Sequence, residues 1–199
     1  MLLFLGTDES FVTQDYNFHV IIDEHALDYK MEDLTPNNCP ILMIELPKME
    51  HQKGKSYLVG VFLPYSYNNK WKTETNNIRG KTYQKLKQEV MDIILKRLEE
   101  KLGKQFKESL KFKLASTPLT LERYTYNYQG SILGWKMDTK NYGKFLPFDT
   151  PIENLYLVGQ WIFPGGGVPG VMASGYYLAK KLLLDDGIDL ESEFKKANS

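Results

Sequence analysis

The chain has 199 residues, of which 42% are hydrophobic and 13% aromatic, so it is long enough for one sizeable core and is not a disordered tail. Lysine plus arginine and aspartate plus glutamate both number 25, so no overall basic field indicates nucleic-acid binding. The single cysteine, Cys39, excludes an intrachain disulfide and is interpreted as a structural or incidental thiol. No apolar run approaches the roughly 18 residues of a membrane span, and we expect a cytoplasmic location.

Apolar and β-branched residues predict four strands in the first third of the chain. The first two cover residues 1–6 and 17–23, and the second holds His19, which we interpret as a packed or half-exposed side chain. Two further runs, 40–47 and 56–64, are nearly continuously apolar, so we expect burial on both faces. The polar connection between them contains Gly54 and is typical of an antiparallel pair.

The middle of the chain predicts a long helix, a strand and a short helix. Apolar side chains recur at helical spacing from about residue 80 to 102, with Gly103 as the stop: Leu86, Val90, Ile93, Ile94 and Leu98. Residues 110–116 alternate as in a strand, with Phe112 and Leu114 on one side. Thr117 and Pro118 then fit the N-cap and first turn of a helix that continues to residue 124.

Residues 154–181 combine a short apolar run, a glycine-rich loop and a helix. The run 155–158 predicts a buried strand, and the helix begins near 168–170, with Pro169 in its first turn, and continues to about residue 184. Consecutive glycines permit positive φ and close approach of a ligand to the backbone, and free N–H groups at a helix start stabilise an electron-rich atom. The alternative is a tight connection whose glycines only allow packing. Neither P-loop nor Rossmann spacing is present.

Two ordered blocks resemble one protein family. The segment 157–159 reads LVG, 164–170 reads PGGGVPG, and Ser174 and Gly175 follow. The segment 117–124 reads TPLTLERY and precedes Gly130 and Gly134. These blocks are similar to the C-terminal motifs of the phytoene desaturase, carotenoid isomerase and retinol saturase family, a branch of the FAD-dependent amine-oxidase-like superfamily. The segment 160–162 reads QWI. It differs from the family, which commonly has small or acidic residues followed by serine or threonine at these positions.

The resemblance implies contacts to FAD and to an apolar substrate. The residues expected at the cofactor are Gly159, Gln160, Gly165, Gly166, Gly167, Val168, Pro169, Gly170 and Val171. Glu122, Tyr124 and Trp135 are candidates for the substrate cavity. Glu122 has alternatives as a surface acid or as a partner for Arg123 or a lysine, and the aromatic residues between 124 and 142 have one as ordinary core and strand faces. In such a flavoenzyme the flavin carries the redox step, and no metal site is expected.

The family's dinucleotide fingerprint is absent, so we expect this chain to be the C-terminal portion of a longer oxidoreductase. The expected activity is desaturation, saturation or isomerisation of an isoprenoid or carotenoid-like substrate.

The predicted fold is α+β: a mixed or antiparallel substrate-binding sheet over 1–150, a flavin-contacting strand, loop and helix over 151–187, and a frayed or short helical tail over 188–199. The alternatives are a non-catalytic module for an apolar ligand or partner, or half of a split enzyme that needs a Rossmann-bearing chain. We expect self-association, or docking onto the sheet, to cover the apolar face of the last element, and peripheral membrane contact stays open.

Overall fold

The computed structural model describes residues 1–11, 18–21, 28–134, 140 and 143–197, and it divides the chain into two compact units, 1–125 and 126–199. The first unit contains the sheet and the long helix, and the second contains the glycine loop and the C-terminal helices. Each unit is described by itself.

The first unit is built on a five-stranded sheet in which every neighbouring pair is antiparallel. The strand order is β2-β3-β4-β1-β5. The strands are β1 (Leu2–Thr7), β2 (Phe18–Ile21), β3 (Ile41–Glu45), β4 (Lys55–Val61) and β5 (Leu110–Ser116). The predicted α+β class is confirmed, the sheet is antiparallel rather than mixed, and β3 and β4 form the expected antiparallel pair. The outer parts of the predicted second strand, 17 and 22–23, lie outside the described residues.

Only one face of the sheet is buried. Side chains alternate between the faces of a strand, and directly paired residues share a face. The buried face carries Leu3, Leu5, Ile41, Met43, Tyr57, Val59, Val61 and Ala115. The expectation that β3 and β4 are buried on both faces is wrong for this chain, because Leu42, Ile44 and Leu58 are only half-buried.

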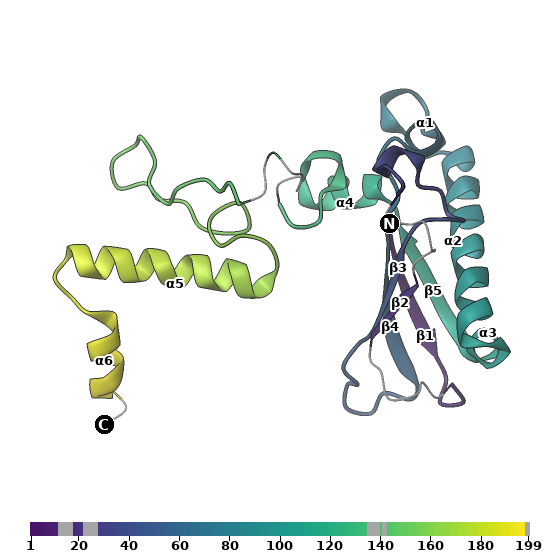
Figure 1. Cartoon of the computed structure of the whole chain (residues 1–199), viewed down its shortest axis with the longest axis horizontal. Helices are drawn as coiled ribbons and strands as arrows, with labels where there is room; N and C mark the ends of the chain where they lie inside the picture. Colours follow the sequence, from purple (N-terminus) through teal and green to yellow (C-terminus); the bar gives the residue numbers. More distant parts are fainter. Residues whose placement is uncertain (12–17, 22–27, 135–139, 141–142, 198–199) are drawn as a thin grey trace. The chain divides into compact units, whose positions relative to one another are not determined.

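The long helix α2 (Lys81–Leu102) runs alongside the sheet (Figure 1) and completes the core. Its buried side chains recur at helical spacing: Tyr83, Leu86, Val90, Met91, Ile94 and Leu98. Four residues of the predicted apolar set are among them, and the fifth, Ile93, is half-buried. Gly103 ends it with a φ of 89°, where its N–H donates to the Glu99 carbonyl at 2.8 Å. Arg97 ties the helix to the segment before β3, since its guanidinium donates to the carbonyl oxygens of Pro36 and Cys39, each at 2.8 Å. Burial raises the pKa of the Cys39 thiol, in keeping with a structural role.

Short helical segments complete the first unit: η1 (Met31–Asp33), α1 (Tyr67–Lys72), η2 (Thr75–Asn77), α3 (Lys104–Ser109) and α4 (Pro118–Thr125). Asn68 to Lys72 have positive φ, so α1 is a left-handed turn. Its Trp71 is fully buried and packs on Tyr67, with ring centroids 5.3 Å apart.

The second unit contains η3 (Tyr128–Gly130), α5 (Val168–Asp185) and α6 (Leu190–Ala197), and the short tail helix is one of the two predicted forms of the tail. The strand expected at 155–158 does not form. Tyr156 makes an isolated bridge to Asp149, and Leu155 and Val158 are exposed. A strand needs a hydrogen-bonded neighbour, and the described part of this unit offers no continuous one.

The second unit has little core of its own. Among its described residues, Ile162 is the one buried hydrophobic side chain, and along α5 only Ser174 is buried. Val168, Met172 and Leu184 are exposed on a helix that is apolar around much of its circumference. A helix that is hydrophobic on most sides is normally buried in a larger protein, so the exposed apolar face predicted for this element is confirmed.

Candidate functional site

The face of the sheet opposite α2 is apolar across all five strands. One row of directly paired residues crosses the sheet: Phe18, Ile44, Leu58, Phe4 and Leu114. A parallel row is formed by Val20, Leu42, Gly60, Leu2 and Ser116. These side chains are exposed or half-buried, Phe4 at 38%. An antiparallel sheet with a solvated face normally alternates apolar and polar residues, so this open face, as we call the two rows, indicates a binding surface.

Gly60 makes a depression at the centre of the open face. It lies in β4, between Leu42 and Leu2, and a Cβ there would meet only Leu42, at an ordinary 3.8 Å. Its φ is not in the left-handed region. A glycine inside a strand destabilises it and often marks the close approach of a ligand. Neither backbone conformation nor internal packing requires this glycine, so the backbone of β4 is open to the approach of another molecule at this point.

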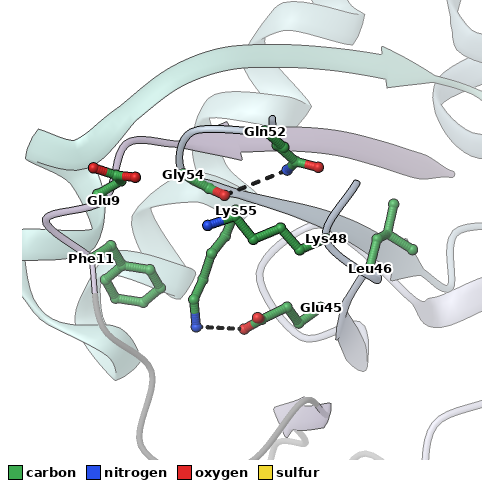
Figure 2. Close-up of a pocket in the computed structure, with 8 residues that line it drawn as sticks. All are labelled: Glu9, Phe11, Glu45, Leu46, Lys48, Gln52, Gly54 and Lys55. Carbon is green, nitrogen blue, oxygen red and sulfur yellow. Dashed lines mark hydrogen bonds and ion pairs between the residues drawn. The ribbon is translucent and has the colours of Figure 1, made fainter. Parts of the chain in front are cut away.

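Two cavities lie where the strands β1 and β4 meet their connecting loops. The smaller, about 260 Å³, lies beside Phe11 and is crossed by the ion pair between Lys55 and Glu45, 3.0 Å long (Figure 2). The larger, about 590 Å³, includes Gly6, Ser56 and Phe112 in its lining. The pairings Gly6–Ser56 and Gly6–Phe112 give these residues the same face as the two apolar rows, so the larger cavity continues the open face.

The glycine loop of the second unit is required partly by its own packing. A Cβ on Gly165 would lie 2.3 Å from the Phe145 ring, and one on Gly170 would lie 2.0 Å from the Gly165 carbonyl oxygen. At Gly159 the φ is 118° and a Cβ would meet nothing within 4 Å. Gly166 and Gly167 also have positive φ and only ordinary contacts. Packing therefore explains Gly165 and Gly170, whereas the other three leave open space beside the backbone.

Ser174 fixes this loop to the first turn of α5. Its buried hydroxyl accepts a hydrogen bond from the Gly159 N–H at 2.9 Å and donates to the Val171 carbonyl at 2.8 Å. The Val171 N–H is used inside the helix, because it donates to the Gly167 carbonyl at 3.0 Å, and Pro169 has no N–H. The groups at the start of α5 that lack an intrahelical acceptor are therefore the N–H groups of Val168 and Gly170.

Residues that follow the first block contact the second block within the second unit. The Gln160 side-chain amide donates to the Asn127 side-chain oxygen at 3.2 Å, and Asn127, which is buried, donates to the Ser131 carbonyl at 2.7 Å. Gly134, with a φ of 90°, packs so closely that a Cβ would lie 2.9 Å from the Gln160 carbonyl oxygen. Gly134, downstream of the first block, thus packs against the loop of the second. Sequence spacing gave no sign that Asn127 is the connecting residue.

The first block anchors α4 to α2. The Thr117 hydroxyl is fully buried and lies 2.8 Å from the Tyr83 hydroxyl of α2. Its carbonyl accepts the N–H groups of Thr120 and Leu121, at 2.9 and 3.2 Å, and so closes the first turn of α4. Thr117 and Pro118 open the helix as predicted, and the buried hydroxyl pair sets its position on the sheet domain.

Replacing Thr117 with valine is expected to lower the free energy of unfolding by about 1–2 kcal/mol, since the Tyr83 hydroxyl then loses its shorter, buried hydrogen bond and keeps only the 3.4 Å contact with the Thr120 hydroxyl. Urea unfolding of the full chain measures this change. Adding Tyr83→Phe should restore part of the loss, because the double variant leaves no hydroxyl unpaired. An additive double variant would contradict the assignment.

Of the predicted substrate residues, Glu122 and Tyr124 lie in the described structure, both on α4. The Glu122 carboxylate accepts a hydrogen bond from the Tyr65 hydroxyl at 2.6 Å, which ties α4 to the segment after β4. Tyr124, Tyr126 and Tyr128 are exposed, so their interpretation as ordinary core is wrong for this chain. Trp135 and Tyr142 lie outside the described residues.

Comparison with curated proteins finds relatives along the whole chain. Prolycopene isomerase of Daucus carota is 36% identical over 113 residues, covering 56% of this chain and 18% of that protein. All-trans-retinol 13,14-reductase of Danio rerio is 25% identical over 209 residues, covering 98% of this chain and 34% of that protein. The 4,4'-diaponeurosporene oxygenase of Staphylococcus aureus strain MW2 is 27% identical over 158 residues, covering 76% of this chain and 29% of that protein. No family model and no solved structure matches significantly.

These curated homologues are members of the phytoene desaturase and carotenoid isomerase family. The chain is homologous to that family. It spans about a fifth to a third of the length of the curated relatives it matches.

Members of the phytoene desaturase and carotenoid isomerase family are FAD-dependent, and the glycine loop is compatible with such a cofactor. The open space beside Gly159, Gly166 and Gly167 would be filled by a Cβ on any other residue, and the start of α5 offers two N–H groups beside it. Among the residues that the structure describes, no group of histidines, cysteines and acids is suited to a metal ion, and no helix is long and apolar enough to cross a membrane.

Proposed function

We propose that this chain supplies the substrate-binding sheet and the flavin-contacting loop and helix of an FAD-dependent oxidoreductase that acts on carbon–carbon double bonds of an apolar polyene. The single observation that carries the proposal is the open face, which is apolar across five strands. At a strand spacing of about 4.8 Å, the row from Phe18 to Leu114 is roughly 19 Å long and can support an extended apolar molecule.

On the substrate side, the open face excludes water and orients the ligand. Leu58 and Phe4 form the centre of one row, and the depression at Gly60 admits part of the ligand to the backbone. The recognition is apolar and non-directional, which suits a hydrocarbon chain that has few hydrogen-bonding groups. The names of the relatives point the same way, since they include a carotenoid isomerase and a retinol reductase.

On the cofactor side, we assign FAD contacts to the backbone of the predicted set from Gly159 to Val171. FAD would supply the redox chemistry at the carbon–carbon bond. The open backbone at Gly159, Gly166 and Gly167 would allow close approach, and the N–H groups of Val168 and Gly170 would favour negative charge at the start of α5. Gln160 acts in this proposal through Asn127, as a residue that holds the loop in position.

The exposed apolar side chains of α5 require a covering partner. We propose that residues 151–187 dock onto the dinucleotide-binding part of the enzyme, supplied by a longer form of this chain or by a separate Rossmann-bearing chain, with self-association as the alternative. A cytoplasmic location and peripheral membrane contact stay predictions.

The proposal is tested by titrating the full chain with all-trans-retinol in detergent and recording retinol fluorescence. We expect saturable binding, and fluorescence no different from detergent alone would overturn the assignment of the open face. A separate FAD titration, alone and with any copurifying dinucleotide-binding chain, tests the cofactor assignment. Retinol binding without FAD binding in either preparation would favour the non-catalytic ligand-binding module.

A further inference from the structure

The larger cavity gives the apolar open face one polar end. It begins at Gly6, Ser56 and Phe112, about 7 Å along the strands from the row that contains Phe4 and Leu58. Beyond these residues its lining is polar and includes Asp8 and Lys111. At the opposite end of the described open face, the row through Leu2 is apolar except for Ser116. A ligand lying along the strands therefore meets polar groups mainly at the Gly6 end.

The Ser56 hydroxyl can donate a hydrogen bond to a ligand at this end of the open face. The Gln52 side-chain amide donates to the Ser56 hydroxyl oxygen at 3.0 Å, so the hydroxyl is already an acceptor. In the described part of the chain its proton has no acceptor. Gly6, directly opposite on β1, carries no side chain to shield it. The unused proton thus lies beside the open face, next to a position that a ligand can occupy.

The charges around the cavity are already balanced. Lys111 pairs with Asp8 at 2.9 Å, and Lys55 pairs with Glu45 at 3.0 Å. Hydrogen bonds from Ser10 and the nearby Lys111 lower the pKa of Asp8 to about 2, so this carboxylate is ionised at neutral pH. Lys53 and Glu9 also line the cavity, so that its three lysines are matched by Asp8, Glu9 and Glu45. A carboxylate ligand would have to compete with Asp8 and Glu45 for two of the lysines and would meet no net positive charge, whereas a neutral oxygen needs only a hydrogen-bond donor.

We propose that the ligand of the open face is an apolar chain with a neutral oxygen at one end, such as an alcohol, and that this oxygen accepts a hydrogen bond from the Ser56 hydroxyl in the cavity beside Gly6. This inference rests on the proposed function and narrows its substrate class.

The test compares three probes of one carbon skeleton, presented in the same detergent to the full chain: all-trans-retinol, its methyl ether, and the hydrocarbon that lacks the oxygen. We expect retinol and the ether to bind roughly three- to ten-fold more tightly than the hydrocarbon, because each can accept the hydrogen bond. Ser56→Ala should reduce this preference to about one and leave the affinity for the hydrocarbon unchanged. Retinoic acid should bind no more tightly than retinol.

Ser116→Ala is the matched control, because Ser116 lies on the same face at the other end of the sheet. It should leave the preference for the oxygenated probes unchanged, and far-ultraviolet circular dichroism checks that both variants fold. Equal binding of all three probes, or a preference lost in Ser116→Ala and kept in Ser56→Ala, would overturn the inference while the proposed function stands. If no probe binds saturably, both fail.

Discussion

Replacing Phe4 with glutamate is expected to weaken all-trans-retinol binding by more than 100-fold. Phe4 is at the centre of the row that runs from Phe18 to Leu114, and it is 38% exposed in the free chain. A ligand on this row would remove the new carboxylate from water without providing a partner, a change that costs several kcal/mol per ion. In the free chain the carboxylate stays hydrated, so we expect the free energy of unfolding to change much less than the free energy of retinol binding. Retinol fluorescence and urea unfolding measure the two quantities.

Ile78→Glu is the matched control for this variant. Ile78 is 57% exposed in the same unit and lies outside the strands, between η2 and α2. The same chemical change there should alter retinol affinity by less than two-fold, since the carboxylate remains in water. If both variants lose binding equally, overall charge is responsible and the open face is not the binding surface.

Replacing Gly170 with alanine is expected to disrupt the glycine loop. The new methyl group would lie 2.0 Å from the Gly165 carbonyl oxygen, so the loop or the start of α5 must shift. Overpacking of this kind costs about 1–3 kcal/mol. The amide groups of Gly159 and Gly166, which donate to Ser174 and to the Gln160 carbonyl, should then exchange their hydrogens roughly ten- to 100-fold faster. Any preparation that binds FAD should lose that binding in the variant.

Gly175→Ala is the control in the same helix. A Cβ there would meet nothing within 4 Å, and alanine is favoured over glycine inside a helix by about 1 kcal/mol. We expect unchanged exchange at Gly159 and Gly166 and unchanged FAD binding. Normal exchange in Gly170→Ala would show that the loop accommodates the methyl group and that the close approach of Gly170 to Gly165 is not essential.

The regular elements of the first unit were predictable because local patterns determine them. The four-residue spacing of Leu86, Val90, Ile94 and Leu98 predicts α2, and the alternation around Phe112 and Leu114 predicts β5 and the side on which they lie. Gly103 and Pro118 mark boundaries because one permits positive φ and the other lacks an N–H.

The strand at 155–158 was wrongly predicted, since its apolar run satisfies a strand pattern but has no continuous neighbour in the described structure to pair with. The apolar runs of β3 and β4 were also misleading. They predicted burial on two faces, whereas this chain covers only one. In both cases the pattern indicates what the residues can bury, and the fold decides whether a partner is available.

By itself, the sequence determined the five strands of the sheet, the helices α2, α4 and α5, the family resemblance and the glycine loop, because these depend on residues that are close together in the chain. Only the tertiary structure decided that Phe18, Leu58 and Leu114 share one open row, since strand order and register are set by pairing between distant segments. The same holds for Asn127, whose contact with Gln160 joins residues 33 positions apart. Local periodicity carries no information about such contacts, and they define the two surfaces on which the proposed function depends.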